Sequence, residues 1–140
     1  MTGGSASSSN RWAVLAVLSG ALAVISLDNT IVNVALPTLQ EDLDATTSQL
    51  QWVVDAYSVM FAGCLLLAGS LGDRFGRRRM LLIGLVIFAL GSVGAALSTN
   101  ADMLTAWRAV MGVGGAFIMP STLSLLVHVF QERTERAQAI

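Results

Sequence analysis

The stretch MFAGCLLLAGSLGDRFGRRRMLLIGLVIFALG, residues 60–91, decides the fold of this chain. Two apolar runs flank a short hydrophilic segment in which four arginines lie between Arg74 and Arg79. An apolar helix of about 20 residues is long enough to cross the roughly 30 Å hydrocarbon layer of a membrane. Arginines in short loops beside such helices favour the cytoplasmic side. The stretch therefore predicts two transmembrane helices joined by a tight cytoplasmic connection.

Further apolar runs extend on both sides of this pair. Together they predict four helices and the start of a fifth, over residues 12–37, 50–72, 80–98, 103–130 and 137–140. Residues 1–10 are rich in Gly and Ser and have nothing to bury, so we expect a flexible cytoplasmic tail. Residues 11–140 then form one membrane-embedded unit, and the expected fold class is an all-α membrane protein.

The composition agrees with this class and excludes several functions. Hydrophobic residues make up 54% of the chain and charged residues 12%, about half the charged share of a soluble domain. A formal net charge of −1 provides no basic field for nucleic acid. The single histidine, His128, and the single cysteine, Cys64, supply neither a metal-ligand set nor a nucleophile with a base. We therefore expect no enzyme, no metal and no cofactor.

The arginines also predict the orientation. Arg11, the cluster at 74–79, Arg133 and Arg136 all fall on one side of the four predicted crossings. The connections on the other side, 38–49 and 99–102, contain acidic residues and no arginine. Because cytoplasmic loops carry the excess of positive charge, we predict a multi-pass protein of the cell (inner) membrane with a cytoplasmic N-terminus.

Two charges, Asp28 and Arg108, lie deep within the predicted spans, while a third, Asp55, lies near the start of its helix. An Asp or Arg at the centre of a transmembrane helix costs about 2.5 to 3.5 kcal/mol, so it needs a function or a partner. At about 1.5 Å per residue, Asp28 lies roughly 13 Å and Arg108 roughly 9 Å from the outer ends of their helices. Our hypothesis is that they share a polar cavity in which the carboxylate exchanges a proton for a cationic substrate. A static neutralising pair is the alternative.

The helix faces near these charges are less easily interpreted. Gly112, Gly115 and Met119 lie within about 40° of Arg108 on the helical wheel and predict an open groove beside it. On the first helix, a polar stripe is centred about 140° from Asp28; its members are Ser19, Ser26, Asn29, Thr30 and Asn33. Either protein surrounds this helix or the stripe serves helix packing. In the third helix, small residues predict a packing face: Gly84, Gly91, Ala95 and Ser98.

Three motifs resemble those of the major facilitator superfamily. The junction Gly69-Ser-Leu-Gly-Asp73-Arg74-Phe-Gly76-Arg77-Arg78-Arg79 resembles its loop signature, G-x-L-x-D-R-x-G-R-R, at every specified position. The segment LDNTIVNVALP, residues 27–37, resembles the first-helix signature of the fourteen-helix drug/proton antiporter branch. Residues 104–116 are similar to the fourth-helix signature, except that Met111 stands in place of the usual glutamine.

The resemblance implies a fold and a function. The chain would be the first four transmembrane helices of an N-terminal six-helix half, and 11–140 would be a partial transporter half. The parent protein would export drugs or other cationic or amphipathic solutes by proton antiport. Its partners would be the proton, the substrate, the lipid bilayer and the remainder of the transporter chain.

The resemblance also implies residue roles. Proton coupling and the substrate cavity would involve Asp28, Asn33, Arg108, Met111, Gly112 and Gly115. A cytoplasmic latch against the other half of the transporter would be formed by Gly69, Asp73, Arg74, Gly76, Arg77 and Arg78. Asp55 is a weaker candidate, because it lies only about one turn into its helix, where a wetted interfacial charge is expected.

Two other functions stay open at this point. A major facilitator uptake symporter would share the loop signature, and the sequence of a fifth helix would separate it from an antiporter. A self-contained four-helix membrane protein, either a small dimeric transporter or an assembly module, suits the length of the chain. It leaves the loop signature unexplained.

Overall fold

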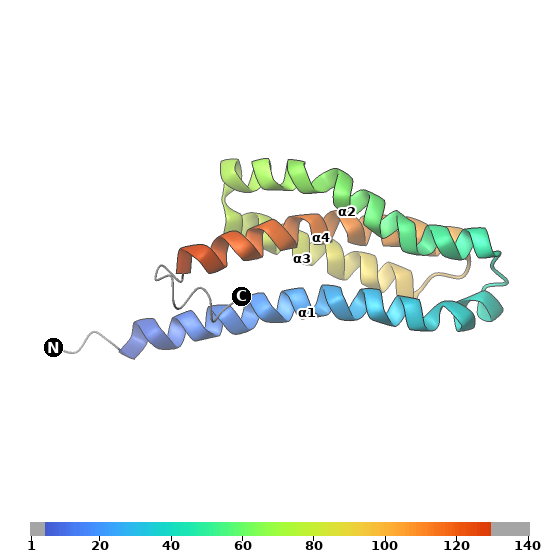
Figure 1. The fold of residues 1–140 in the computed structure, drawn as a ribbon, viewed down its shortest axis with the longest axis horizontal. Coiled ribbons are helices and arrows are strands. Elements are labelled where there is room, and N and C mark those ends of the chain that lie inside the picture. Colours follow the sequence, from blue (N-terminus) through green and yellow to red (C-terminus); the bar gives the residue numbers. More distant parts are fainter. Residues whose placement is uncertain (1–4, 130–140) are drawn as a thin grey trace.

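Four antiparallel helices make up the computed structural model, which describes the backbone of residues 5–129 and the side chains of 11–128. They are α1 (Ser5–Asp42), α2 (Thr47–Phe75), α3 (Arg77–Ala96) and α4 (Ala101–Val129). Figure 1 shows the chain reversing direction at each connection, so that the α1–α2 and α3–α4 links lie at the same end. All four helices are long and apolar enough to cross a membrane. The predicted all-α membrane fold is thereby confirmed.

The first helix is longer than expected. It begins at Ser5 and ends at Asp42, whereas the sequence predicts residues 12–37. Residues 5–10, expected to be flexible tail, are helical; residues 1–4 lie outside the described part. The helix also continues through Pro37, since the fixed φ of proline fits a helix and only one backbone hydrogen bond is lost. The predicted fifth helix at 137–140 also lies outside the described residues.

A capping box starts α2 three residues before the predicted Leu50. The Gln49 amide donates to the Thr46 side chain over 3.3 Å, and the Thr46 amide donates to Gln49 Oε1 over 3.0 Å. The pattern Thr-x-x-Gln is the sequence signature of such a start. The pair provides acceptors for two backbone amides that would otherwise lack partners at the start of a helix. It therefore fixes where α2 begins after the acidic connection.

The junction between α2 and α3 is a single residue. Gly76 has a φ of +98°, in the region that favours glycine, and it separates helices that end at Phe75 and begin at Arg77. The predicted helix borders at 72 and 80 are therefore too far apart, because all four arginines of the cluster are helical. The sharp reversal places the start of α3 beside the end of α2.

Glycines bring α3 and α4 into close contact. A methyl group at Gly91 would lie 2.6 Å from Met111 Cγ, and one at Gly84 would lie 2.8 Å from Phe117 Cβ. Small residues allow such approach where lipid offers no hydrophobic drive for association. The same side of α3 includes Gly94, which lies against the Trp107 ring. The predicted packing face of α3 is confirmed at Gly84 and Gly91.

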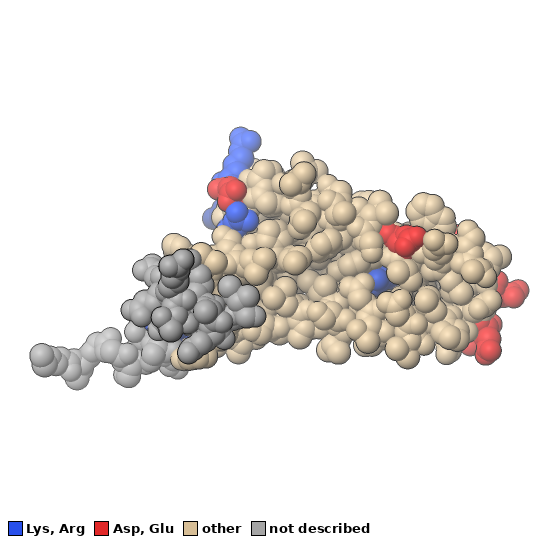
Figure 2. Space-filling view, in the orientation of Figure 1, with Lys and Arg blue, Asp and Glu red and all other residues tan. Residues whose placement is uncertain are grey.

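The fourth helix is the centre of the bundle. It packs extensively against α2 and α3, while α1 makes fewer contacts, mainly with α4 and α2. Figure 1 shows α1 alongside the other three helices, and in Figure 2 charged side chains gather at the two ends of the molecule. The acidic end contains the α1–α2 connection, and the opposite end contains the arginines at the α2–α3 junction. A largely uncharged body lies between them.

Candidate functional site

Arg108 is the most deeply buried charge among the described residues. Its side chain is 1% exposed and lies about two turns after the start of α4. Its Nη1 forms an ion pair and hydrogen bond with Asp28 Oδ2 of α1. The structure thus brings together the two intramembrane charges that lie 80 residues apart in the sequence. Their role in proton exchange stays a prediction.

Two further acceptors complete the environment of the guanidinium. Nε donates to the Val53 carbonyl oxygen of α2 over 3.3 Å, and Nη2 donates to Asn29 Oδ1 over 3.4 Å. Each nitrogen of Arg108 therefore has a polar partner, and the partners come from two other helices. A guanidinium is always charged and has a planar set of donors, so it suits a buried position with several acceptors.

The ring of Tyr57 covers the guanidinium from α2. The Arg108 Cζ atom lies 4.6 Å from the ring centroid, within the range of a cation–π interaction. Tyr57 lies one helical turn after Val53, so consecutive turns of α2 supply a carbonyl and an aromatic face to the same charge. The sequence analysis did not identify Val53, Tyr57 or the inward direction of Asn29. The available signal was a lone tyrosine in an apolar span, whose hydroxyl needs a polar neighbour.

The polar stripe of α1 divides into two parts. Asn29 faces the site: its Nδ2 donates to the Ile25 carbonyl, which leaves Oδ1 for Arg108. The other members are exposed. Three of them bond to carbonyls of their own helix: Ser26 to Leu22 over 3.1 Å, Thr30 to Ser26 over 3.0 Å and Asn33 to Asn29 over 2.8 Å. Asn33 therefore does not reach Arg108, although the sequence analysis grouped it with the site.

The predicted groove beside Arg108 is filled. Gly112 lies against the Tyr57 carbonyl, and a methyl group at Gly115 would lie 2.7 Å from the Tyr57 hydroxyl oxygen. Met111 is 1% exposed and packs against Gly91 of α3. These three residues therefore lie in contacts between helices. The expected open space is occupied because α2 crosses α4 at this level.

Access to the site differs between its two charges. The Asp28 side chain is 18% exposed and that of Arg108 is 1% exposed. Asp28 is therefore the more accessible of the two charges in the described part of the chain. Asp55 is half-buried on α2, and no ion pair joins it to a basic side chain in the described part of the chain. Within residues 5–129, no group of three His, Cys, Asp or Glu side chains could hold a metal.

The loop signature forms a compact corner. Asp73 pairs with Arg77, four residues later and across the junction, and Arg77 also lies against Gly72. Arg74 Cζ lies 5.6 Å from the centroid of the Phe75 ring. No described atom comes within 4 Å of a methyl group placed at Gly69 or Gly76, so the chain itself provides no close approach there. The contact of these residues with another half stays a prediction.

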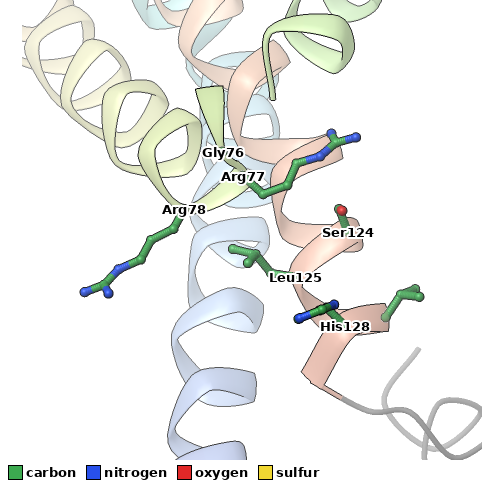
Figure 3. A pocket seen from close by; sticks show the side chains of 7 residues that line it. Gly76, Arg77, Arg78, Ser124, Leu125 and His128 are labelled. Atoms are coloured by element: carbon green, nitrogen blue, oxygen red, sulfur yellow. The ribbon is translucent and has the colours of Figure 1, made fainter. Parts of the chain in front are cut away.

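An open pocket of about 530 Å³ adjoins this corner. It lies between the start of α3 and the end of α4, and its lining includes Arg77, Arg78, Leu125 and His128. Figure 3 shows Arg77 and Arg78 leaving the start of α3 in different directions, with Leu125 and His128 projecting from α4. The pocket is therefore a partly basic surface at the arginine-rich end, far along α4 from Arg108.

Comparison with known proteins identifies the family. A family model described as Major Facilitator Superfamily matches residues 18–140. Over 92% of its length the chain is 46% identical to the "Multidrug efflux pump LfrA" of Mycolicibacterium smegmatis. It is 44% identical over 90% of its length to the "Methylenomycin A resistance protein" of Streptomyces coelicolor. It is also 37% identical over 93% of its length to the "Methyl viologen resistance protein SmvA" of Salmonella typhimurium.

Each of these matches covers 26% of the relative, so the chain spans about a quarter of the length of the curated relatives it matches. The family match covers most of the chain, including all three motifs that suggested it. The buried Asp28–Arg108 pair, the four membrane-length helices and the matched family model agree. The chain belongs to the Major Facilitator Superfamily, a family of membrane transporters and not of enzymes.

Proposed function

We propose that this chain is the N-terminal part of a secondary transporter that exports drugs or other amphipathic solutes in exchange for protons. The observation that carries the proposal is the ion pair between Asp28, which is partly exposed, and Arg108, which is fully buried. The names of the relatives, which include multidrug efflux and methyl viologen resistance, support export over uptake.

The geometry supports an exchange at Asp28. When the carboxylate is ionised, it neutralises Arg108 inside the apolar body. When it takes up a proton, the attraction to Arg108 is lost and the side chain is free to turn outward. An arriving cation favours the ionised form again and releases the proton, so that one carboxylate serves two cations in turn. Arg108 remains a fixed positive charge and does not itself contact the substrate.

The setting follows from the charges at the two ends. We infer a multi-pass protein of the cell (inner) membrane whose arginine-rich end, with the N-terminus, faces the cytoplasm. Its partners are the proton, a cationic or amphipathic solute, the lipid bilayer and the remainder of the transporter. The corner of Asp73 and Arg77 would contact that remainder. A closed pair of helical halves is needed for alternating access, and this chain supplies four helices of one half.

Replacement of Asp28 tests the proposal in the full-length transporter reconstituted in vesicles. Asp28→Asn keeps the size of the side chain but cannot ionise, so it should reduce transport driven by an imposed proton gradient by at least about tenfold, on the scale of one lost charge contact. Asp28→Glu should retain part of it. The measurement is the rate at which a fluorescent cationic dye crosses the membrane.

Asp44→Asn is the matched control, because it makes the same chemical change at a residue that lies between α1 and α2, outside the membrane-spanning helices. Its φ of +48° is tolerated by asparagine, so this variant should fold and transport normally. Gradient-driven transport by Asp28→Asn at the rate of the control would refute the coupling role. Movement of the dye with the protons, instead of against them, would indicate a symporter.

A further inference from the structure

The environment of Arg108 poses a question about the state in which Asp28 has taken up a proton. Arg108 remains charged at any physiological pH, and its side chain is 1% exposed. A buried charge whose partner is removed is strongly destabilising. If Asp28 leaves or becomes neutral, three groups remain around the guanidinium: the Val53 carbonyl, the Asn29 side chain and the Tyr57 ring.

The two hydrogen bonds that remain are long. They measure 3.3 Å to Val53 and 3.4 Å to Asn29, beyond the usual range for such contacts. The Val53 carbonyl also lies one turn before Tyr57 in α2, so it is the acceptor for the backbone amide of Tyr57 within the helix. The face of the Tyr57 ring, whose centroid is 4.6 Å from Arg108 Cζ, is therefore the most direct compensation for the charge. Cation–π attraction grows as water is removed, and Tyr57 is 4% exposed.

The surroundings of Tyr57 fix its ring in this place. Gly112 accommodates the Tyr57 backbone carbonyl, and Gly115 accommodates its hydroxyl, 2.7 Å from where a methyl group would lie. Phe61, one turn after Tyr57 on α2, stacks with the Tyr57 ring, and the two ring centroids lie 6.0 Å apart. The buried hydroxyl forms no hydrogen bond of ordinary geometry within residues 11–128. The ring, and not the hydroxyl, makes the contact with Arg108.

We propose that Tyr57 is a positioning residue of the exchange site, whose ring holds the Arg108 guanidinium in place while Asp28 is neutral. This inference rests on the proposed function, and it adds a residue that neither the motifs nor the family match identify. By stabilising the unpaired arginine, the ring makes protonation of Asp28 easier and so sets the pH at which proton and cation exchange. Tyr57 acts through Arg108 and need not touch the substrate.

Few other ionisable groups lie near this site. From α1 the site includes Asp28, from α4 Arg108, and from α2 Tyr57 itself, with Asp55 half-buried on the same helix. Asp55 forms no ion pair with Arg108. α3 contributes no ionisable side chain between Met80 and Ala96. A change in the pH response after substitution of Tyr57 can therefore be assigned to the Asp28–Arg108 pair, and combination with Asp28→Asn checks the assignment.

The first experiment does not depend on transport. Thermal unfolding of the purified full-length transporter is measured for Tyr57→Leu, with and without Asp28→Asn, which mimics the neutral carboxyl. The fall in Tm caused by Tyr57→Leu should be at least twice as large in the Asp28→Asn background, because Arg108 then depends on the ring. Phe61→Leu is the matched control on the same side of α2 and should lower Tm equally in both backgrounds.

The results of this cycle are decisive either way. Equal falls in Tm for Tyr57→Leu in the two backgrounds would show that Tyr57 only packs, and would overturn the inference. One outcome is that the Tyr57→Leu, Asp28→Asn double variant alone fails to accumulate, while each single variant and Asp28→Asn with Phe61→Leu accumulate. That failure then counts as the expected larger destabilisation by Tyr57→Leu in the Asp28→Asn background. Tyr57→Phe in the Asp28→Asn background should restore most of the Tm lost with leucine, since it keeps the ring.

The second experiment measures the pH profile. Protons released when tetraphenylphosphonium is added to the weakly buffered protein are recorded at pH values from about 5 to 9. Tyr57→Leu should move the midpoint of release to lower pH by about one unit, a tenfold change, and Tyr57→Phe should move it back toward wild type. An unchanged midpoint in Tyr57→Leu would contradict the inference. Absence of release from the wild type would refute the proposed function, while the unfolding cycle would still decide the role of Tyr57.

Discussion

At the scale of single residues, the choice of arginine at position 108 follows from the number of acceptors around it. Its three nitrogens donate to Val53, Asp28 and Asn29, and its Cζ atom lies 4.6 Å from the centroid of the Tyr57 ring. A lysine is a compact charge on a flexible stem and cannot form a planar fork or stack in this way. The side chain therefore contributes through its shape as well as through its charge.

Arg108→Lys should consequently impair transport although the charge is retained. We expect gradient-driven dye transport by the full-length protein to fall at least about tenfold, because a bidentate or stacked arginine is not replaced by lysine. Arg79→Lys is the control, since Arg79 is exposed and lies outside the residues of the predicted latch. Equal transport rates for Arg108→Lys and the control would show that only the charge matters.

The site was partly predictable at this scale. Asp28 and Arg108 could be identified because charges in apolar spans are costly, and their similar depths suggested that they meet. Tyr57 and Asn29 could not, because their contribution depends on how α1 and α2 are rotated about their axes against α4. A helical wheel gives angles within one helix but not between helices. For the same reason the groove predicted at Gly112 and Gly115 proved to be occupied by α2.

At the scale of helices, contacts of α4 are made largely through glycine. Gly114 is a glycine of α4 that faces α3: a methyl group there would lie 2.7 Å from the Phe88 amide nitrogen and 2.8 Å from the Gly84 carbonyl oxygen. Both atoms belong to the backbone of α3, so rotation of a side chain cannot relieve the clash. The separation of the two helices is therefore set at this point.

Gly114→Ala should destabilise the transporter by about 1 to 3 kcal/mol, the usual cost of overpacking. The measurement is the Tm of the purified full-length protein, which should fall by several degrees as ~1 kcal/mol shifts Tm by about 2 to 4 °C in larger domains. Gly20→Ala on α1 meets nothing within 4 Å among the described atoms and is the control. A Tm for Gly114→Ala no lower than that of Gly20→Ala would contradict the packing described here.

The helices themselves followed from the sequence more closely than their borders did. Charge-free runs decided the four crossings, and the spacing of Gly84 and Gly91 indicated the packing face of α3. The start of α2 was predictable from Thr46 and Gln49 but depends on a capping signature that a hydropathy pattern overlooks. The extension of α1 past Pro37 was not predictable, because proline ends some helices and is tolerated in others.

At the scale of the whole molecule, the two charges of the site belong to parts that pack differently. α2, α3 and α4 pack closely and hold Arg108, while α1 carries Asp28 and makes fewer contacts with the rest. Most charges gather at the two ends of the molecule (Figure 2), while the Asp28–Arg108 ion pair lies between them. This arrangement suits a fixed counter-charge and an exchangeable carboxylate, which is the central claim of the account.

Proton release measures that claim most directly. Purified full-length transporter in weakly buffered detergent solution receives tetraphenylphosphonium at a pH where Asp28 holds a proton, and a pH indicator reports the protons released. If Asp28 exchanges a proton for a cation, release from the wild type saturates with the ligand and is lost in Asp28→Asn. Asp44→Asn behaves as the wild type. Undiminished release from Asp28→Asn, or ligand binding by wild type without any release, would contradict this exchange.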